Sequence, residues 1–263
     1  MEMEVLYGVH PVEEALRSGA RSLDHVMIAR ERRDDQKMLR IAEACRTAGV
    51  RVRFDNRDAL DRLARSDTHQ GIVAVARERK FAGISDLLAK RGQYHFVLAL
   101  DGIEDPHNLG ALLRTAEGAG VDGVVIPERR SAPITATVVK ASAGASEHVR
   151  IARVTNLVRA LEELKANNIW CVGLDERATV DYDQFDFRLD CALVLGREGE
   201  GLHDLVRRTC DHLVRIPMAG QVASLNVSVA GAVVMYEAAR QRRAVNQPGE
   251  AVRPKKSQRG LGS

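Results

Sequence analysis

Aromatic residues are scarce in this chain of 263 residues, because Phe, Tyr and Trp together make up only 4% of it. Proteins that hold single-stranded nucleic acid by stacking bases on side chains usually contain more of them. The sequence therefore disfavours a base-stacking platform. Apolar residues make up 45% and charged residues 29%, as is typical of a globular protein with one large domain or two smaller ones.

Signals for disulfides, metals and membranes are also missing. The four cysteines are far apart and form no CxxC pair, which predicts reduced core cysteines in a cytoplasmic protein. The eight histidines show no ligand spacing, so we expect no metal site. No apolar run reaches membrane-spanning length, and the acidic start MEMEVLYGV is not a signal peptide. We therefore expect no membrane partner.

The common nucleotide-binding motifs are absent or misplaced. No GxxxxGK[ST] occurs, and GAGVDG matches the dinucleotide pattern GxGxxG only in letters. In a dehydrogenase that dinucleotide motif follows a strand and opens a helix. Here Gly118, Gly120 and Gly123 close a predicted helix and precede the predicted strand GVVIP. We interpret them as a helix C-cap and a tight turn, which argues against a nicotinamide-dependent dehydrogenase.

The net charge of +3 hides an asymmetry along the chain. Residues 240–263 hold seven basic residues and one acidic residue, so the preceding 239 residues carry a net charge of −3. A basic tail can add non-specific affinity for phosphates, or it can be a solubilising disordered end. Both readings stay open. Residues 246–263 have almost no apolar content, and we expect them to form a disordered basic tail.

Strand and helix signals alternate in two blocks. Residues 1–79 predict a small α/β unit, and residues 80–94 predict a linker that carries a short helix. Residues 95–245 contain six strand candidates, and helical segments separate most of them. These strand candidates are HFVLALD, GVVIP, HVRIARV, IWCVGL, CALVLG and HLVRIP. Apolar strands alternating with helices predict a mostly parallel sheet that is covered on both faces.

One unusual segment, DGIEDPHNLGALLRTAE, follows the first of these strands. Ligands of open α/β sheets bind beyond the carboxyl ends of strands, so this is a candidate site. Asn108 stands where a helix is expected to begin, and asparagine is a good N-cap. Arg114 lies in an otherwise apolar helix, where a guanidinium needs an anion or another acceptor. Capping alone for Asn108 and a structural salt bridge for Arg114 remain alternatives.

Two more candidate segments lie near the end of the chain. In GREGEGL, Gly196, Gly199 and Gly201 surround Glu198, and such glycines let backbone approach a ligand closely. In VASLNVSVAG, three polar residues alternate with apolar ones: Ser224, Asn226 and Ser228. We expect them to straddle a loop and a helix start. They either cap that helix or point toward a substrate, and we assign Ser228 to capping or packing.

Together, three stretches resemble the motifs of the SpoU branch of the SPOUT RNA methyltransferases in order and spacing. They are NLGALLRTAEGAGVDGVVIP, LVLGREGEGL and IPMAGQVASLNVSVAGAV. Residues 1–79, with YGVHPVEEAL and HQGIVAVA, resemble that family's small RNA-binding domain, which is similar to ribosomal-protein folds. The resemblance implies an α/β fold with a C-terminal trefoil knot over roughly residues 190–235, an exception to the usual absence of knots. It also implies a homodimer whose active site lies near the interface.

The resemblance further implies methyl transfer from S-adenosylmethionine to the ribose 2′-hydroxyl of a guanosine in large-subunit (23S) ribosomal RNA. Matched by motif position, the proposed catalytic set is Asn108, Arg114, Glu198, Ser224 and Asn226. By the same matching, Gly196, Ile216 and Leu225 contact the cofactor, mainly through their backbone. Gly201 matches the position that lets the neighbouring loop close.

The resemblance also suggests how the catalytic residues divide their work. A guanidinium with a pKa above about 12 is a poor general base. We therefore interpret Arg114 as binding the adjacent phosphate and orienting the hydroxyl. Asn226 and Ser224 would hold the ribose or Arg114, and Glu198 would orient Asn108 or Arg114.

Two alternatives remain at this stage. One is a tRNA ribose 2′-O-methyltransferase of the same family. The other is a non-catalytic RNA-binding or ribosome-assembly module with an inactive core.

Overall fold

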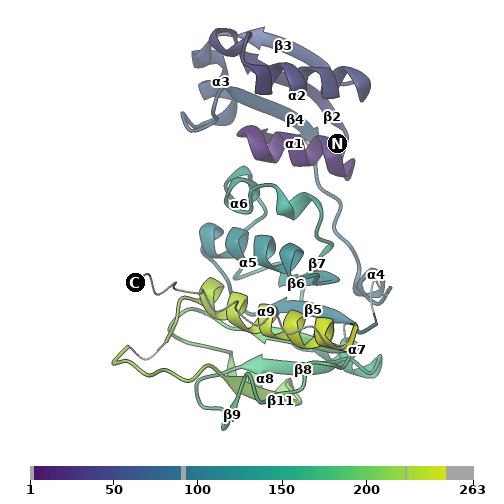
Figure 1. Ribbon diagram of the computed structural model, residues 1–263, viewed down its shortest axis with the longest axis vertical. Coiled ribbons are helices and arrows are strands. Elements are labelled where there is room, and N and C mark those ends of the chain that lie inside the picture. The colour runs from purple at the N-terminus through teal and green to yellow at the C-terminus, as the bar shows by residue number, and fades with distance from the viewer. Residues whose placement is uncertain (1–2, 90–92, 223, 247–263) are drawn as a thin grey trace, which may run out of the picture.

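Two α/β units are stacked along the long axis of the molecule (Figure 1). The computed structural model describes residues 3–89, 93–222 and 224–246. The first unit has a four-stranded sheet in the order β1-β4-β2-β3, in which only β2 and β3 are parallel. Its elements are β1 (Met3–Tyr7), α1 (Val9–Ser18), β2 (Leu23–Ala29), η1 (Arg30–Arg32), α2 (Gln36–Thr47), β3 (Arg51–Asp55), α3 (Arg57–Ala64) and β4 (Ile72–Arg77).

The second unit is a seven-stranded sheet in the order β7-β6-β5-β10-β8-β11-β9, and each pair of neighbouring strands is parallel. The predicted mostly parallel sheet is therefore confirmed. Its strands are β5 (Phe96–Leu100), β6 (Gly123–Pro127), β7 (Ile151–Val154), β8 (Trp170–Leu174), β9 (Val180–Asp181), β10 (Cys191–Leu195) and β11 (His212–Arg215). Its helices are α4 (Ile84–Leu87), α5 (Pro106–Gly118), α6 (Ala136–Ala141), η2 (Ala145–Glu147), α7 (Leu157–Ala166), α8 (Asp204–Thr209) and α9 (Val227–Asn246).

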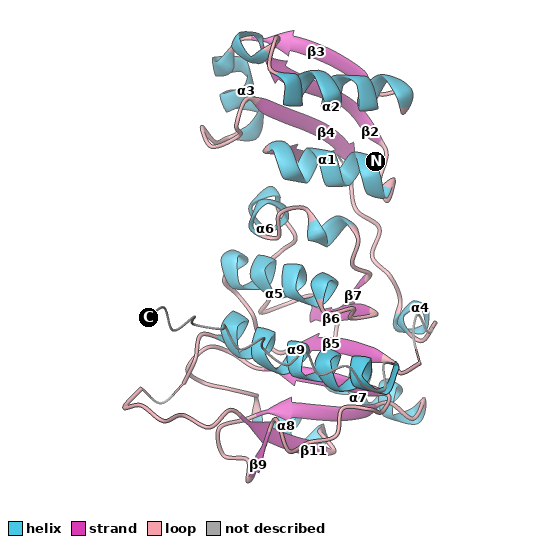
Figure 2. Ribbon diagram, viewed as in Figure 1, coloured by secondary structure: helices cyan, strands magenta, loops and turns pink. Residues whose placement is uncertain are grey.

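Helices cover both faces of the larger sheet, as the apolar strands require (Figure 2). Successive side chains of a strand point to opposite faces, and β5 divides in this way. Phe96, Leu98 and Leu100 join the apolar cluster that contains α5, α6 and α9. Val97 and Ala99 join the cluster that contains α7 and α8. The sheet is rigid because its strands are buried on both faces. Since the strands are parallel, their carboxyl ends and the loops that follow lie together at one edge of this sheet.

The cysteines belong to this core and form no disulfide among the described residues. Cys45, Cys171 and Cys191 are buried, and Cys210 is half-buried. Burial raises the pKa of the Cys191 thiol to about 12. Such a thiol is protonated at neutral pH and is a weak nucleophile.

A buried cluster of charges joins the two units. Glu147, at the end of η2, has a side chain with 0% exposure. It accepts two hydrogen bonds from Arg21, each of 2.8 Å, and one of 2.5 Å from Arg79. Arg21 also donates to Glu4. Burial lowers the pKa of Arg79, whereas for Arg21 the opposing effect of Glu147 and Glu4 exceeds that of burial and raises its pKa. The cluster spans the interface because Arg21 and Glu147 belong to different units.

The linker is also attached to the larger sheet. The Ala82 amide donates to the Ile151 carbonyl at 2.8 Å, and Ala82 forms a parallel bridge with Ala152 of β7. The Arg153 guanidinium lies 4.8 Å from the centre of the Phe81 ring. Lys140, at the other side of the interface, donates to the Thr68 carbonyl at 2.9 Å. The two units are therefore joined by several separate contacts.

Two expectations about α5 have different outcomes. The prediction that Asn108 is its N-cap is wrong, because Pro106 occupies the first turn and Asp105 is the cap. The Asp105 carboxylate accepts from the amides of His107 and Asn108 at 3.2 and 3.1 Å. Proline suits this first position because its missing N–H has no intrahelical partner there. The interpretation of GAGVDG is confirmed, since α5 ends at Gly118 and Gly120 turns with φ of +76°.

The predictions about the tail, membranes and metals can be compared with the structure only within the described residues. The tail predicted over residues 246–263 lies, from residue 247 onward, outside the described residues. Within the described ranges, no helix is long and apolar enough to cross a membrane. The same part of the chain contains no group of three or more His, Cys, Asp or Glu side chains placed to hold a metal ion.

Candidate active site

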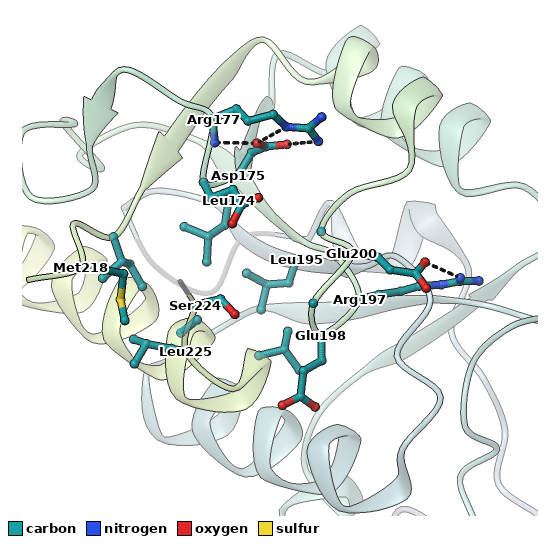
Figure 3. A pocket seen from close by; sticks show the side chains of 17 residues that line it. Leu174, Asp175, Arg177, Leu195, Arg197, Glu198, Glu200, Met218, Ser224 and Leu225 are labelled. Carbon is teal, nitrogen blue, oxygen red and sulfur yellow. Dashed lines mark hydrogen bonds and ion pairs between the residues drawn. The ribbon is translucent and has the colours of Figure 1, made fainter. Parts of the chain in front are cut away.

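A cleft opens beyond the carboxyl ends of β8, β10 and β11, in a position typical of ligand sites in α/β sheets (Figure 3). The four residues that match the family's cofactor positions all line it: Gly196, Gly201, Ile216 and Leu225. Leu174 and Leu195 add apolar walls, and Glu176 and Glu198 add carboxylates at the lining.

The loop after β10 is closed by two glycines in direct contact. Arg197 and Gly201 exchange backbone hydrogen bonds of 2.9 and 3.0 Å. Gly201 has a φ of +72°, and a Cβ added at Gly196 would lie only 2.2 Å from the Gly201 carbonyl carbon. Any side chain at Gly196 would therefore push the loop open. This geometry agrees with the expectation that Gly201 lets the loop close.

Gly196→Ala is expected to weaken the affinity for S-adenosylmethionine about tenfold or more, because an overpacked site costs roughly 1–3 kcal/mol. Isothermal titration calorimetry measures this directly. Gly220→Ala is the matched control, since a Cβ there meets nothing within 4 Å. Equal affinities for both variants and the wild type would show that the loop does not need this close contact.

Beside the cleft, three side chains from separate elements form a closed triangle. Asn108 on α5 donates from Nδ2 to Glu198 Oε2 at 3.1 Å. Asn226, directly before α9, donates from Nδ2 to Asn108 Oδ1 at 3.0 Å and to Glu198 Oε1 at 3.2 Å. Each amide thus has a fixed orientation. The structure brings together three of the five proposed catalytic residues.

Capping of α9 sets the orientation of Asn226. Its Oδ1 accepts from the Ser228 amide at 2.9 Å and from the Ser228 hydroxyl at 2.6 Å. Because the oxygen is occupied by the helix start, the Nδ2 group must point toward Asn108 and Glu198. The two readings of the alternating polar segment therefore coexist at Asn226, which both caps the helix and belongs to the triangle. Ser228 lies in the first turn of α9 and donates to this cap from both its amide and its hydroxyl, so it is the capped residue and not the cap.

The other two proposed catalytic residues, Ser224 and Arg114, are not part of the triangle. Ser224 lines the cleft and is exposed. Arg114 is also exposed, and it makes no hydrogen bond or ion pair within the described chain. Six helical residues rotate a side chain by about 240° and advance it by about 9 Å, so Arg114 and Asn108 leave α5 in different directions. Of the two partners expected for Glu198, it contacts Asn108 and not Arg114.

Two residues at this site, Asp175 and Arg197, were not predicted from the sequence. Asp175 follows β8, and its carboxylate accepts from the backbone amide and the Nε of Arg177 at 2.9 and 3.1 Å. Burial opposes ionisation of Asp175, but the hydrogen bonds from Arg177 lower its pKa overall. Arg197 lines the cleft and the neighbouring hollow beside Asn108. The sequence does hold one signal for Asp175 and Arg197, because both lie directly after or close to the end of a predicted strand.

Comparison with known proteins places this geometry in a family. Residues 95–236 match the model of the SpoU rRNA Methylase family. The chain belongs to the SpoU rRNA methylase family. Residues 5–82 of this SpoU protein match a second model, described as RNA 2′-O ribose methyltransferase substrate binding. Both halves of the described architecture thus have known counterparts.

Individual relatives of this SpoU methyltransferase cover nearly the whole chain. It is 47% identical over 240 residues to the 23S rRNA (guanosine-2′-O-)-methyltransferase RlmB of Bordetella pertussis, covering 91% of this chain and 98% of the relative. The protein of the same name from Escherichia coli is 43% identical over 242 residues, covering 91% and 99%. The crystal structure of the SpoU methyltransferase AviRb from Streptomyces viridochromogenes, in complex with AdoMet, has a TM-score of 0.78 at 27% identity and covers 92% and 91%.

Proposed function

We propose that this protein transfers a methyl group from S-adenosylmethionine to the ribose 2′-hydroxyl of a guanosine in 23S ribosomal RNA. The observation that carries the proposal is the fixed triangle of Asn108, Glu198 and Asn226 directly beside the cleft. The identity of 47% and 43% with the two relatives named for that reaction supports the substrate. RNA rather than DNA follows from the chemistry, because only RNA offers the 2′-hydroxyl.

The lining of the cleft fits the cofactor. Apolar side chains such as Leu195, Ile216 and Leu225 suit a flat purine ring, and the glycine-rich loop exposes backbone amides and carbonyls to polar groups. When bound, S-adenosylmethionine supplies an electrophilic methyl group on a sulfonium. Gly196, Ile216 and Leu225 would hold it, mainly through backbone. The protein's remaining task is to align the hydroxyl oxygen and to assist the loss of its proton.

The triangle supplies the alignment. The Glu198 carboxylate is exposed and has acceptor capacity beyond its two amide bonds, so it can accept a hydrogen bond from a ribose hydroxyl. Asn108 and Asn226 keep that carboxylate in one orientation. Ser224, on the cleft lining, would hold the ribose from the other side. Arg114 would bind the neighbouring phosphate and orient the hydroxyl, whose proton passes to a phosphate oxygen or to water.

We propose a homodimer because Arg114 makes no hydrogen bond or ion pair with the triangle of its own chain. The surface near Arg114 includes exposed apolar side chains of α9, Val229 and Tyr236, which are 49% and 48% exposed. The Tyr236 hydroxyl approaches Gly118 of α5, the helix that carries Arg114. Pairing of this α5–α9 face between two copies would bury these side chains and bring Arg114 to the partner's triangle. The trefoil knot and a cytoplasmic location stay predictions that accompany this proposal.

The proposed function is tested by methyl transfer from labelled S-adenosylmethionine. The substrates are large-subunit ribosomal RNA from cells lacking the gene and, in parallel, total tRNA. We expect 2′-O-methylguanosine in the ribosomal RNA only, identified by mass after digestion to nucleosides. Label in tRNA alone would favour a tRNA ribose methyltransferase. Measurable cofactor binding without transfer to either RNA, or to ribosomal particles, would favour a non-catalytic RNA-binding module.

A further inference from the structure

Two arginines on the loop between β6 and α6 have no partner in the described chain. Arg129 and Arg130 are both exposed, and neither makes a hydrogen bond or an ion pair there. Most other arginines of the second unit have a partner in the chain, for example Arg177 with Asp175 and Arg215 with Asp181. The preceding Glu128 is also exposed, so the segment of residues 128–130 has a net charge of +1.

The backbone of this loop is fixed in an unusual shape. Arg130 has a φ of +57°, a left-handed conformation that side chains other than glycine and asparagine rarely adopt. The loop is held on both sides, because the Glu128 amide donates to Val154 and the Ala132 amide donates to Ile103. Ser131 adds a shielded hydroxyl that has no hydrogen-bond partner among the described residues. Strained residues that the surroundings hold in place are typical of functional sites.

The loop is anchored beside the proposed site of methyl transfer. Ile103, which accepts from Ala132 at 2.8 Å, lines the hollow that also contains Asn108, Arg197 and Glu198. In the sheet, β6 is the direct neighbour of β5, and β5 is the direct neighbour of β10. Neighbouring strands lie about 4.8 Å apart. The arginines therefore follow the strand next to β5, which leads to Asn108 on α5, and β10, which leads to Glu198, is one strand further away.

The order of the strands also shows how the cleft, the triangle and the arginine loop are arranged along this edge of the sheet. The cleft lies beyond β11, β8 and β10, the triangle beyond β10 and β5, and the arginine loop beyond β6. The loop leads directly into α6, which packs against β1 of the first unit. Figure 1 shows the first unit stacked beyond this end of the sheet. In this order the β6 loop lies between the first unit and the triangle, on a path that an RNA strand bound to the first unit can take.

We propose that Arg129 and Arg130 bind a backbone phosphate of the substrate RNA next to the target nucleotide. Exposed arginines are common phosphate ligands, and such contacts position a nucleic acid without reading its sequence. The anchored loop holds the backbone of both arginines in a fixed place relative to the triangle, so a phosphate bound there sets the register of the RNA. This inference rests on the proposed function and adds a phosphate site to it.

The test is the salt dependence of binding to deproteinised large-subunit ribosomal RNA, measured by filter binding at several salt concentrations. Each lost phosphate contact lowers the slope of log affinity against log salt by about one. We expect this change for Arg130→Asn, with affinity about tenfold weaker at low salt. Asparagine removes the charge but tolerates the left-handed backbone. Arg130→Lys is expected to keep the slope, and Arg129→Ala with Arg130→Asn is expected to lower it further.

Arg159→Ala is the matched control, because Arg159 is an exposed arginine on α7, which packs on the opposite face of the sheet. An unchanged slope and affinity in the double variant would overturn the inference, and so would an equal loss in the Arg159 variant. A loss of cofactor affinity would also overturn it by indicating a structural role. Because the readout is RNA binding, it stays distinct from the proposed function, which fails if the wild type transfers no methyl group.

Discussion

Replacing Arg114 with alanine is expected to lower kcat by about 100- to 1000-fold, the usual cost of removing a charged group that acts at the reacting atoms. Affinity for S-adenosylmethionine is expected to stay the same, because Arg114 does not line the cleft. Arg114→Lys keeps the charge but loses the planar fork that binds phosphate through two nitrogens. Near-wild-type turnover of the lysine variant would contradict the idea of two-point positioning.

The position of Arg114 makes a second result possible. Asn108, Glu198 and Asn226 contact one another within one chain, whereas Arg114 makes no hydrogen bond or ion pair with any described residue. In the proposed symmetric dimer, a mixture of inactive Arg114→Ala and inactive Asn226→Ala chains forms heterodimers with one intact site. After unfolding and refolding together in equal amounts, we expect about a quarter of the wild-type activity to return. A mixture as inactive as its components would show that Arg114 acts in its own chain.

Glu147→Ala is expected to have the largest effect on stability. It would leave two buried arginines, Arg21 and Arg79, without their shared carboxylate. Removing one partner of a buried ion pair typically lowers the free energy of unfolding by about 3–5 kcal/mol. For a chain of this size we expect the melting temperature to fall by roughly 10 °C. Differential scanning calorimetry measures both quantities.

Two further variants separate the causes of this effect. Glu147→Gln keeps the acceptor oxygen but not the charge, and it is expected to lie between the wild type and Glu147→Ala. Glu163→Ala removes an exposed glutamate on α7 and is expected to leave the melting temperature within about 1 °C, as surface substitutions usually do. If Glu147→Ala melted like the Glu163 variant, the cluster would contribute nothing to the joining of the two units.

The larger sheet could be predicted well because its strands are short, continuous apolar runs. FVLAL and CALVL, for example, are buried on both faces and sit between helical segments. The strand β9 was not expected, because its two residues, Val180 and Asp181, form no apolar run. For the first unit we predicted only an α/β unit, not its single elements, although Asn56 caps α3 with its side chain. Short elements of this kind depend on tertiary pairing more than on their own sequence.

The candidate site could be assembled only in part from the sequence. The glycine-rich loop and the polar residues before α9 stood out because they interrupt apolar patterns, and the structure places them at one cleft. The triangle needs a contact between Asn108 and Asn226, which are 118 residues apart. The same distance problem hides the pairing of Arg21 with Glu147, 126 residues apart. No local pattern encodes such contacts, and the isolation of Arg114 on its helix is visible only in three dimensions.

The way the linker runs along β7 has a consequence for aggregation. An edge strand of a sheet presents unpaired amides and carbonyls that can pair with another chain. Ala82 already pairs with this edge through its bridge to Ala152, and Phe81 lies under Arg153 beside it. The opposite edge, β9, is only two residues long. Once folded, the seven-stranded parallel sheet therefore offers intermolecular pairing only short or occupied edges.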